Sequence, residues 1–381
     1  RRQPHLQVYC LMLPDPRPYF ANLVDPRRET KNKLHSLHDI LMIVLCAVLS
    51  GVDDWVGMEC FAEEKEVWFR QFLSLNNGIP SHDTLSDVMG RIQYEAFAQA
   101  FLAWSQTALP SLAGEQIAID SKTLRGSRQL GQDTVHLVSA FAARAKLVLA
   151  QTSVSEKSNE IKAIPTILAA LELEGATVTI DAMGCQKDIA AQIILQKADY
   201  VLALKDNHRT LADDATLWMN TEYDAGRMTV HETIEKDHGR IETRRYVLSE
   251  QLGWLTQKPE WSGLHTLGMV ESTRDINGKS SCDRRYFICS FNDLPRFANA
   301  VRQHWSIENQ QHWLLDVQFN EDANRSRKDH SAKNLATIRR MALNLIRHNA
   351  PNSKRSLRSR QLSAALNDDY RFNLIFANKN T

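Results

Sequence analysis

Gln116-Ile-Ala-Ile-Asp120 and Ala176-Thr-Val-Thr-Ile-Asp181 are the two stretches that decide the fold of this chain. Both are short runs of apolar and β-branched residues, which favour β-strands, and each run ends on an aspartate. In open α/β sheets, sites form at the carboxyl ends of the strands. A carboxylate there is costly to bury unless it is paired or binds a cation. The two aspartates are therefore expected to share one site.

Strand and helix patterns alternate around these two stretches. Strands are expected at 136–141, 147–154 and 200–204, and helices at 161–173 and 188–196. The order of three strands, helix, strand, helix, strand predicts a mixed α/β sheet of the ribonuclease-H-like kind. Order alone does not prove that fold, because many folds share such an order.

The chain has 381 residues, which is more than one compact core usually takes. Further domains are therefore expected outside the α/β core. Residues 35–109 have apolar side chains at helical spacing, 222–291 alternate as strands do, and helices resume at Leu294. The α/β core is thus expected to carry a β-rich insertion, to follow an all-helical N-terminal domain and to precede a helical, basic C-terminal region. The expected organisation is an extended N-terminal arm at 1–25, a helical domain at 26–110, the first part of the core at 111–221, the β-rich insertion at 222–292, the second part of the core at 293–348, and a basic C-terminal tail at 349–381.

A polar stripe marks the helix expected at 302–317. Its members recur every four residues and so share one helical face: His304, Glu308, His312 and Asp316. A polar stripe amid large apolar residues is unexpected for a core helix. Glu308 is therefore a candidate to face the two strand-end aspartates.

Three carboxylates, Asp120, Asp181 and Glu308, suit two hard cations such as Mg²⁺, which prefers oxygen ligands and keeps some waters. Two such ions roughly 4 Å apart activate a water or a 3′-hydroxyl for in-line attack on phosphorus. The spacing alone also allows salt bridges or helix caps at these positions. Zinc fits less well, because the two histidines around Glu308 lack the H-E-x-x-H spacing.

Positive charge is concentrated near the C-terminal end. The whole chain has a net charge of only +1, but residues 323–361 contain eleven Lys or Arg and one acid. Such a patch is a footprint of phosphate binding, and a solvated helical face is the alternative. Candidate phosphate contacts in this stretch and in the strand-end loops are Lys122, Arg125, Lys157, Lys205, Arg325 and Lys328.

Several classes of protein are disfavoured by the composition. The longest apolar run, 40–49, is too short to span a bilayer, and no signal peptide is visible, so no membrane partner is expected. The six cysteines have no C-x-x-C spacing and are expected to be free thiols in a reducing cytoplasm.

Four segments together resemble the H-repeat-associated insertion-sequence transposases, a family of DDE transposases with a ribonuclease-H-like core. They stand in the family's order at 118–126 (AIDSKTLRG), 156–165 (EKSNEIKAIP), 180–189 (IDAMGCQKDI) and 304–317 (HWSIENQQHWLLDV). The resemblance covers nearly the whole chain. It implies that Asp120, Asp181 and Glu308 are the catalytic triad, holding two Mg²⁺ or Mn²⁺ ions. It also implies cleavage of double-stranded DNA at element ends, strand transfer into target DNA, a homodimer on DNA and a nucleoid-associated cytoplasmic location.

The chain departs from the Tyr, Arg, Glu, Lys signature that many DDE transposases carry around the last acid. The four positions read Val301, His304, Glu308 and Leu315. His304 stands in place of the arginine that contacts phosphate, but histidine is uncharged for much of the time near neutrality. The neighbouring Arg302 is a candidate substitute, and His312 is a further candidate DNA contact.

These departures leave two alternatives open, a catalytically silent DNA-binding protein derived from a transposase and a two-metal nuclease without strand transfer. Two further hypotheses concern DNA contacts outside the triad. The helix after Ser81 has the setting of a recognition helix, although plain packing explains it as well. Trp254 and Trp261 are candidates to stack on an unpaired base or, equally, to anchor the β-rich insertion.

Overall fold

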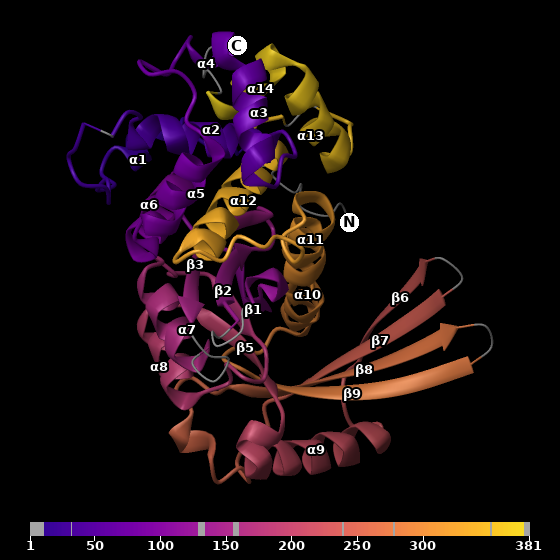
Figure 1. Cartoon of the computed structure of the whole chain (residues 1–381). Coiled ribbons are helices and arrows are strands. Elements are labelled where there is room, and N and C mark those ends of the chain that lie inside the picture. The colour runs from indigo at the N-terminus through magenta and orange to yellow at the C-terminus, as the bar shows by residue number, and fades with distance from the viewer. Residues whose placement is uncertain are drawn as a thin grey trace.

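The fold is a large mixed β-sheet with helices on its faces and helical regions at both ends of the chain (Figure 1). The computed structural model describes residues 11–31, 33–128, 134–154, 160–237, 240–276, 279–350 and 353–376. The mixed α/β class expected from the strand patterns is confirmed.

The N-terminal part is helical, as its spacing predicts. Its helices are α1 Arg17–Phe20, α2 Leu37–Leu49, α3 Trp55–Glu64, α4 Glu66–Phe69, α5 His82–Arg91 and α6 Tyr94–Ala108. Ser81 caps α5, because its side chain accepts a hydrogen bond from the backbone N–H of Thr84. The apolar run at 40–49 is the buried interior of α2, around which the other helices pack.

One nine-stranded sheet runs through the rest of the molecule, in the order β3-β2-β1-β4-β5-β9-β8-β7-β6. Its strands are β1 Gln116–Thr123, β2 His136–Ala142, β3 Leu147–Val154, β4 Thr177–Ile180, β5 Asp199–Leu204, β6 His231–Asp237, β7 Arg240–Ser249, β8 Thr266–Ile276 and β9 Lys279–Cys289. β1, β4 and β5 are parallel neighbours, and all other pairs are antiparallel. The β-rich insertion therefore extends the core sheet instead of forming a sheet of its own. The expected hairpin turn at Asn277-Gly278 lies outside the described residues.

Helices cover both faces of the sheet. They are α7 Glu160–Ala169, α8 Lys187–Leu195, α9 Arg209–Asp224, α10 Leu294–His304, α11 Trp313–Phe319 and α12 Ser331–His348, with a π-helical turn, η5 Glu308–His312, between α10 and α11. α7 and α8 pack on one face, and α10 crosses β1, β4 and β5 on the other (Figure 1). α12 lies between the N-terminal helices and β3.

Buried polar groups on α12 tie these parts together. Asn334 donates to the backbone oxygens of Met89 and Ile92, at 2.8 and 2.9 Å. At the edge of the sheet, Asn344 bonds both backbone groups of Val148, accepting from its N–H at 3.1 Å and donating to its oxygen at 2.8 Å. Such bonds satisfy backbone groups that would otherwise be buried without a partner.

The described parts of the arm and the tail, from residue 11 and up to residue 376, pack against the rest of the molecule. Leu13 is 1% exposed, and both of its backbone groups bond the side chain of Asn349. Within 349–381, α13 Leu357–Leu366 and α14 Asp368–Ile375 pack against the helical region, with Arg371 fully buried over the ring of Trp68. The apolar residues in these segments carry no helical period long enough to reveal this docking.

No helix among the described residues is long and apolar enough to cross a bilayer.

Candidate active site

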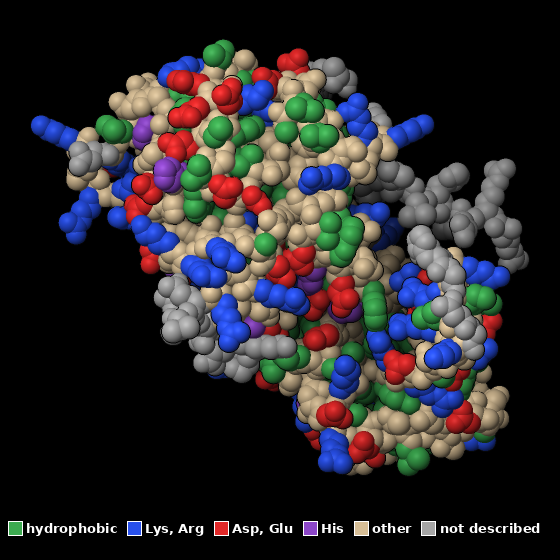
Figure 2. Space-filling view, turned by 45° about the vertical axis from the view of Figure 1, so that its right-hand side comes forward, with side chains coloured by type: hydrophobic (Ala, Val, Ile, Leu, Met, Phe, Trp, Pro, Cys, Tyr) green, Lys and Arg blue, Asp and Glu red, His purple; other side chains and the backbone are tan. Residues whose placement is uncertain are grey.

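The three carboxylates expected from the sequence line one cleft. In the parallel pair β1–β4, Ile119 is in register with Ile180, so Asp120 and Asp181 follow side by side at the ends of the paired segments. Glu308, the first residue of the π-helical turn, borders the same cleft, whose volume is about 660 Å³. Figure 2 shows acidic and histidine side chains gathered at the centre of this face, with Lys and Arg side chains beside them.

Asp120 sits in a crowded, negatively charged environment. Its pKa is raised to about 7, chiefly by burial and also by the negative charges of Asp181, Glu308 and Glu160, while a hydrogen bond from Ser121 N–H at 2.8 Å lowers it. A cation would relieve this repulsion, so the donor set fits hard divalent ions. Among the described residues, no group of three His, Cys, Asp or Glu side chains is already drawn together as a metal-binding cluster.

Glu160 is a fourth acid that the sequence analysis did not assign to the site. It begins α7, is 5% exposed, and lines a small cavity together with Asp120 and Asp181. Its signal was present in the sequence, because Glu160 lies within the segment 156–165 that supports the resemblance. A lone acid at the start of a helix reads as an ordinary first-turn residue, so the pattern did not single it out.

The helix that carries Glu308 is docked on the sheet by buried polar contacts. The side chain of Gln116 donates to the backbone oxygen of Ala300 at 2.7 Å and to Thr179 Oγ1 at 3.2 Å. His304 Nδ1 is 2.8 Å from the same Thr179 oxygen. These contacts fix the end of α10 over β1 and β4, immediately before the π-helical turn.

Both histidines expected to contact DNA are turned to internal partners. Burial lowers the pKa of His304 to about 4 and that of His312 to about 3, so neither ring is cationic near neutral pH. His312 Nδ1 lies 3.6 Å from Asp120 Oδ2. Contact of these two rings with DNA stays a prediction, as contact by neutral rings, and His304 borders the main cleft.

Lys122 is likewise directed inward. Its side chain is 7% exposed, and Nζ forms ion pairs with Asp316, with Asp322 at 3.2 Å and with Glu321 at 3.4 Å. Its expected contact with phosphate is therefore corrected, since the charge is already neutralised by three carboxylates. Arg125 nearby is 82% exposed, with Nε 3.5 Å from Asp322.

The remaining candidate cations occupy three places. Lys205 is exposed and borders the main cleft. Arg302 is half-exposed and forms a two-pronged pair with Glu235 of β6, at 2.9 Å for both contacts. Arg325 and Lys328 line a separate open hollow beside Trp55, where Lys328 pairs with Asp87. Lys157 lies outside the described residues.

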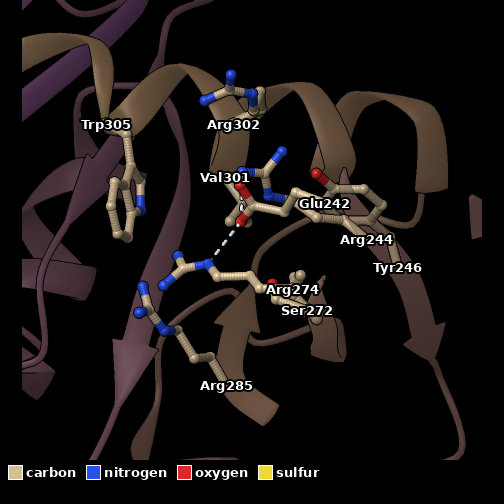
Figure 3. Close-up of a pocket in the computed structure, with 10 residues that line it drawn as sticks. Glu242, Arg244, Tyr246, Ser272, Arg274, Arg285, Val301, Arg302 and Trp305 are labelled. Carbon is tan, nitrogen blue, oxygen red and sulfur yellow. Dashed lines mark hydrogen bonds and ion pairs between the residues drawn. The ribbon is translucent and has the colours of Figure 1, made fainter. Parts of the chain in front are cut away.

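A second, smaller pocket adjoins the main cleft on the β6–β9 side of the sheet (Figure 3). Arg244, Arg274 and Arg285 point into it around Glu242, and Arg302 borders it from α10. It shares Arg285, Val301 and Trp305 with the main cleft, so the two are neighbours. The guanidinium of Arg285 lies 5.0 Å from the centre of the Trp305 ring, a cation–π contact.

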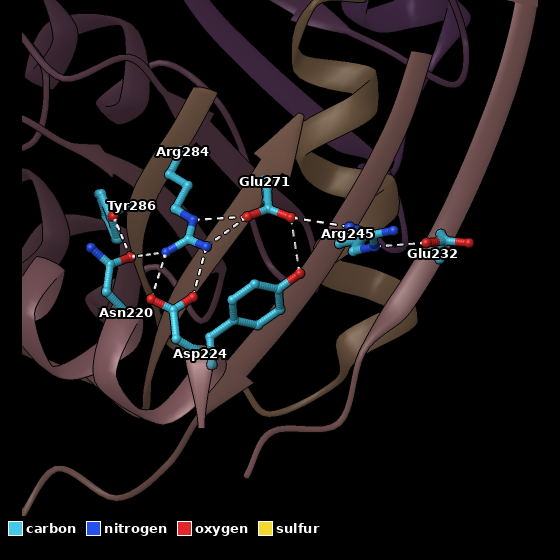
Figure 4. A network of polar contacts seen from close by, with 8 residues as sticks. Asn220, Asp224, Glu232, Arg245, Glu271, Arg284 and Tyr286 are labelled. Carbon is cyan, nitrogen blue, oxygen red and sulfur yellow. Dashed lines mark hydrogen bonds and ion pairs between the residues drawn. The ribbon is translucent and has the colours of Figure 1, made fainter. Parts of the chain in front are cut away.

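The opposite face of these strands is closed by a polar network (Figure 4). Arg284 bonds Glu271 on β8 and Asp224 on α9, both at 2.8 Å. Glu271 also accepts from Tyr223 at 3.0 Å. This network holds α9 against the sheet, and Arg284 within it also lines the main cleft.

Two further DNA-contact hypotheses lose support. Trp261 is 3% exposed, and Trp254 packs with its ring centre 5.0 Å from that of Trp218, so both anchor the insertion. α5 packs on α2, α3 and α12, and its outer side carries Asp83 and Asp87, an unfavourable charge for a helix facing phosphates.

Comparisons with known proteins show the family of the chain. Residues 112–345 match the family model described as "Transposase DDE domain", and residues 18–105 match the "DDE_Tnp_1-associated" domain. The chain is 52% identical over 288 residues to an "Uncharacterized protein in dhlA 3'region" of Xanthobacter autotrophicus, covering 74% of this chain and 97% of that protein. It is 36% identical over 363 residues to the "H repeat-associated putative transposase YhhI" of Escherichia coli K12, covering 92% and 94%.

Among solved structures, the piggyBac transposase in its synaptic complex with hairpin DNA gives a TM-score of 0.40 at 11% identity, over 95% of this chain and 88% of that chain. A likeness of this size carries no argument here. The resemblance to the H-repeat-associated transposases is confirmed by the family match and the curated relatives. The chain belongs to the transposase DDE domain family.

Proposed function

We propose that this chain is a metal-dependent DNA transposase in which Asp120, Asp181 and Glu308 form the catalytic triad. One observation carries the proposal: acids from two neighbouring parallel strands and from a helix more than a hundred residues away border one cleft. Convergence of carboxylates from distant segments is expected of a site for hard cations, because it is otherwise electrostatically unfavourable.

The first five strands support a ribonuclease-H-like core. Their order is β3-β2-β1-β4-β5, with β2 antiparallel to both of its neighbours and β1, β4 and β5 parallel. Asp120 and Asp181 then stand near the carboxyl ends of the two central strands, where sites in such sheets form. In this interpretation, β6–β9 are the insertion between Asp181 and Glu308.

The triad would hold two Mg²⁺ or Mn²⁺ ions. The chemistry that these ions supply when bound is activation of a water or a 3′-hydroxyl and stabilisation of the leaving oxygen. The chain itself contributes orientation. His312 packs beside the Asp120 carboxylate, and the contacts of α10 hold the helix that leads to Glu308 over the sheet. The half-enclosed cleft limits the water around the reacting phosphate and so strengthens these electrostatic interactions.

The DNA strand is proposed to run from the triad onto the β6–β9 side. Arg285 and Trp305 border both the main cleft and the smaller pocket, so a strand leaving the triad meets a cation and an aromatic ring together. Lys205 contacts the backbone from the opposite wall, and Arg325 extends the basic surface toward the helical region. Element ends and target DNA are the proposed substrates, bound by a homodimer at the nucleoid.

Strand cleavage tests the proposal directly. A duplex carrying the terminal repeat of the encoding element is incubated with Mg²⁺ or Mn²⁺ and the wild type, Asp120→Ala, Asp181→Ala or Glu308→Gln. Each variant is expected to lose more than about 100-fold in rate, because loss of an outer-shell partner alone typically costs up to that much. The control is Glu174→Gln, which removes an exposed acid paired with Lys197 away from the cleft.

Three outcomes have distinct meanings. Full cleavage by all three triad variants would refute the assignment. DNA binding by the wild type without cleavage at any metal concentration would identify a silent DNA-binding relative. Cleavage without joined products on added target DNA would identify a nuclease that lacks strand transfer.

A further inference from the structure

Lys122 and Asp316 are related to the triad by their positions in the chain. Lys122 lies two residues beyond Asp120 on β1, so both side chains project from the same face of the strand. Asp316 lies two turns beyond Glu308 on the helix formed by η5 and α11. The Lys122–Asp316 ion pair therefore joins the strand of one triad acid to the helix of another.

The helix and the strand meet at two successive levels. At the first, His312 approaches Asp120 at 3.6 Å, and at the second, Asp316 pairs with Lys122. Two strand residues span about 6.6 Å, and four helical residues span about 6 Å, so the two spacings match. Sliding the helix by one residue along β1 would break both contacts. It would also move Glu308, which precedes His312 by one helical turn, relative to Asp120.

The groups around Lys122 are themselves held in place. Glu321 is fully buried and bonds Arg340 of α12 at 2.7 Å, and Arg340 is also fully buried. Gly126 after β1 approaches the backbone so closely that a Cβ there would lie 2.1 Å from the oxygen of Asn324. The loop that follows α11 is thus fitted tightly against the end of β1, and the Lys122 ammonium has a fixed setting.

We propose that the Lys122–Asp316 ion pair is a positioning device that sets the height of Glu308 relative to Asp120 and so prepares the triad to bind metal ions. The inference rests on the proposed function, because it assigns these acids as metal ligands. Neither Lys122 nor Asp316 is a catalytic residue in this scheme. Both act through the placement of the strand and the helix.

The test measures Mn²⁺ binding directly, without DNA, by electron paramagnetic resonance. Asp316→Asn removes the charge at a side chain that is 34% exposed, so the variant is expected to fold. Its dissociation constant for Mn²⁺ is expected to rise about tenfold, as for loss of a group that orients a ligand. Asp316→Glu keeps the charge and should restore most of the affinity.

Nicking of supercoiled plasmid over a Mn²⁺ titration gives the second readout. Asp316→Asn should need about tenfold more Mn²⁺ for half-maximal nicking and should approach the wild-type rate at saturation, because the ligands themselves are intact. Lys122→Met should raise the Mn²⁺ requirement in the same direction, but it also removes a partner of Glu321 and Asp322, so it should lose thermal stability that Asp316→Asn keeps. Glu260→Gln breaks the exposed Lys187–Glu260 pair and serves as the control, with no shift expected.

Other results would overturn the inference. Binding of Mn²⁺ by Asp316→Asn as tight as that of the wild type would contradict it. So would a variant that loses thermal stability and nicking in equal measure while its Mn²⁺ requirement stays unchanged. A wild type that fails to bind Mn²⁺ would overturn the proposed function as well. A wild type that binds Mn²⁺ but cleaves no DNA, with weaker binding by Asp316→Asn, would overturn only the transposase proposal.

Discussion

The two halves of the nine-stranded sheet handle charge in opposite ways. In the half made of β1–β5, strands are short and largely buried, and the acids at their ends are crowded together. In the half made of β6–β9, burial fades along the strands, and β8 runs from six buried residues to two exposed ones. There, arginines are paired with acids on both faces. One half concentrates unfavourable charge at a fixed point, whereas the other spreads compensated charge over a surface.

The largest expected difference between the halves concerns stability. Arg340→Leu removes the fully buried partner of Glu321 behind the triad and should cost about 3–5 kcal/mol, because a buried carboxylate loses its main partner. Arg274→Leu removes a 39% exposed partner of Glu242 in the β6–β9 half and should cost at most about 1 kcal/mol. Urea unfolding measures both values. Equal losses would break the comparison.

DNA binding should depend on the β6–β9 half, and arginines inside and outside the cleft provide the test. Arg285→Ala removes the cation beside Trp305 and should weaken DNA binding about tenfold, lowering the slope of affinity against salt concentration by about one unit. Arg245→Ala, on the opposite face, removes contacts to Glu232 and Glu271 and should reduce stability without changing that slope. Fluorescence anisotropy over a salt series measures the slope. A matching change in both variants would contradict the assignment of the two faces.

The mutual repulsion of the acids in the core half should lower the stability of the fold. Replacing one of them by an uncharged amide should therefore raise the stability. Asp120→Asn keeps the size of the side chain and removes one of the mutually repelling charges, so Tm should rise by about 1–3 °C while cleavage is lost. Asp275→Asn in the exposed part of β8 serves as the control and should leave Tm unchanged. A fall in Tm for Asp120→Asn would mean that neighbouring groups of the protein stabilise the charged carboxylate even without a bound cation.

Mild acid should distinguish the halves by a smaller effect. In the β6–β9 half, burial raises the pKa of Glu242, but Arg274 and Arg244 outweigh it and hold this pKa below its ordinary 4.5. The charged carboxylate therefore stabilises the fold above pH 4.5, and this stabilisation is lost as pH falls through the lowered pKa. In the core half, burial raises the pKa of Glu115, so the destabilisation from its ionised form is relieved as pH falls. Hydrogen exchange, corrected for intrinsic rates, should show β7 and β8 opening before β1 and β4 below pH 4.5. The reverse order would contradict this assignment.

Local patterns predicted the parts of the molecule that depend on neighbouring residues. β1 and β4 follow from apolar and β-branched runs, although β1 continues three residues past Asp120 to Thr123, and the Ser81 cap follows from a polar residue before a helical period. Once β1 and β4 pair in this register, the two aspartates follow side by side.

Long-range pairing and irregular backbone could not be predicted in this way. Lys122 read as a surface cation, because its partner Asp316 is 194 residues away. The helix expected at 302–317 is divided by the π-helical turn Glu308–His312, a shift in hydrogen bonding that leaves no mark on residue spacing. The internal partners of His304 and His312 were hidden for the same reason, since burial of a polar stripe depends on what packs over it.

The amide of Asn344 closes one border of the sheet, because it occupies the outward backbone groups of Val148 on β3. No further strand can therefore pair with β3 at Val148, and the insertion joins the sheet on the far side of β5, where β9 pairs. The charged outermost strand β6, with Glu232 and Lys236, discourages another chain from continuing the series. A single side chain on α12 thus keeps this point of the opposite edge from pairing with another chain.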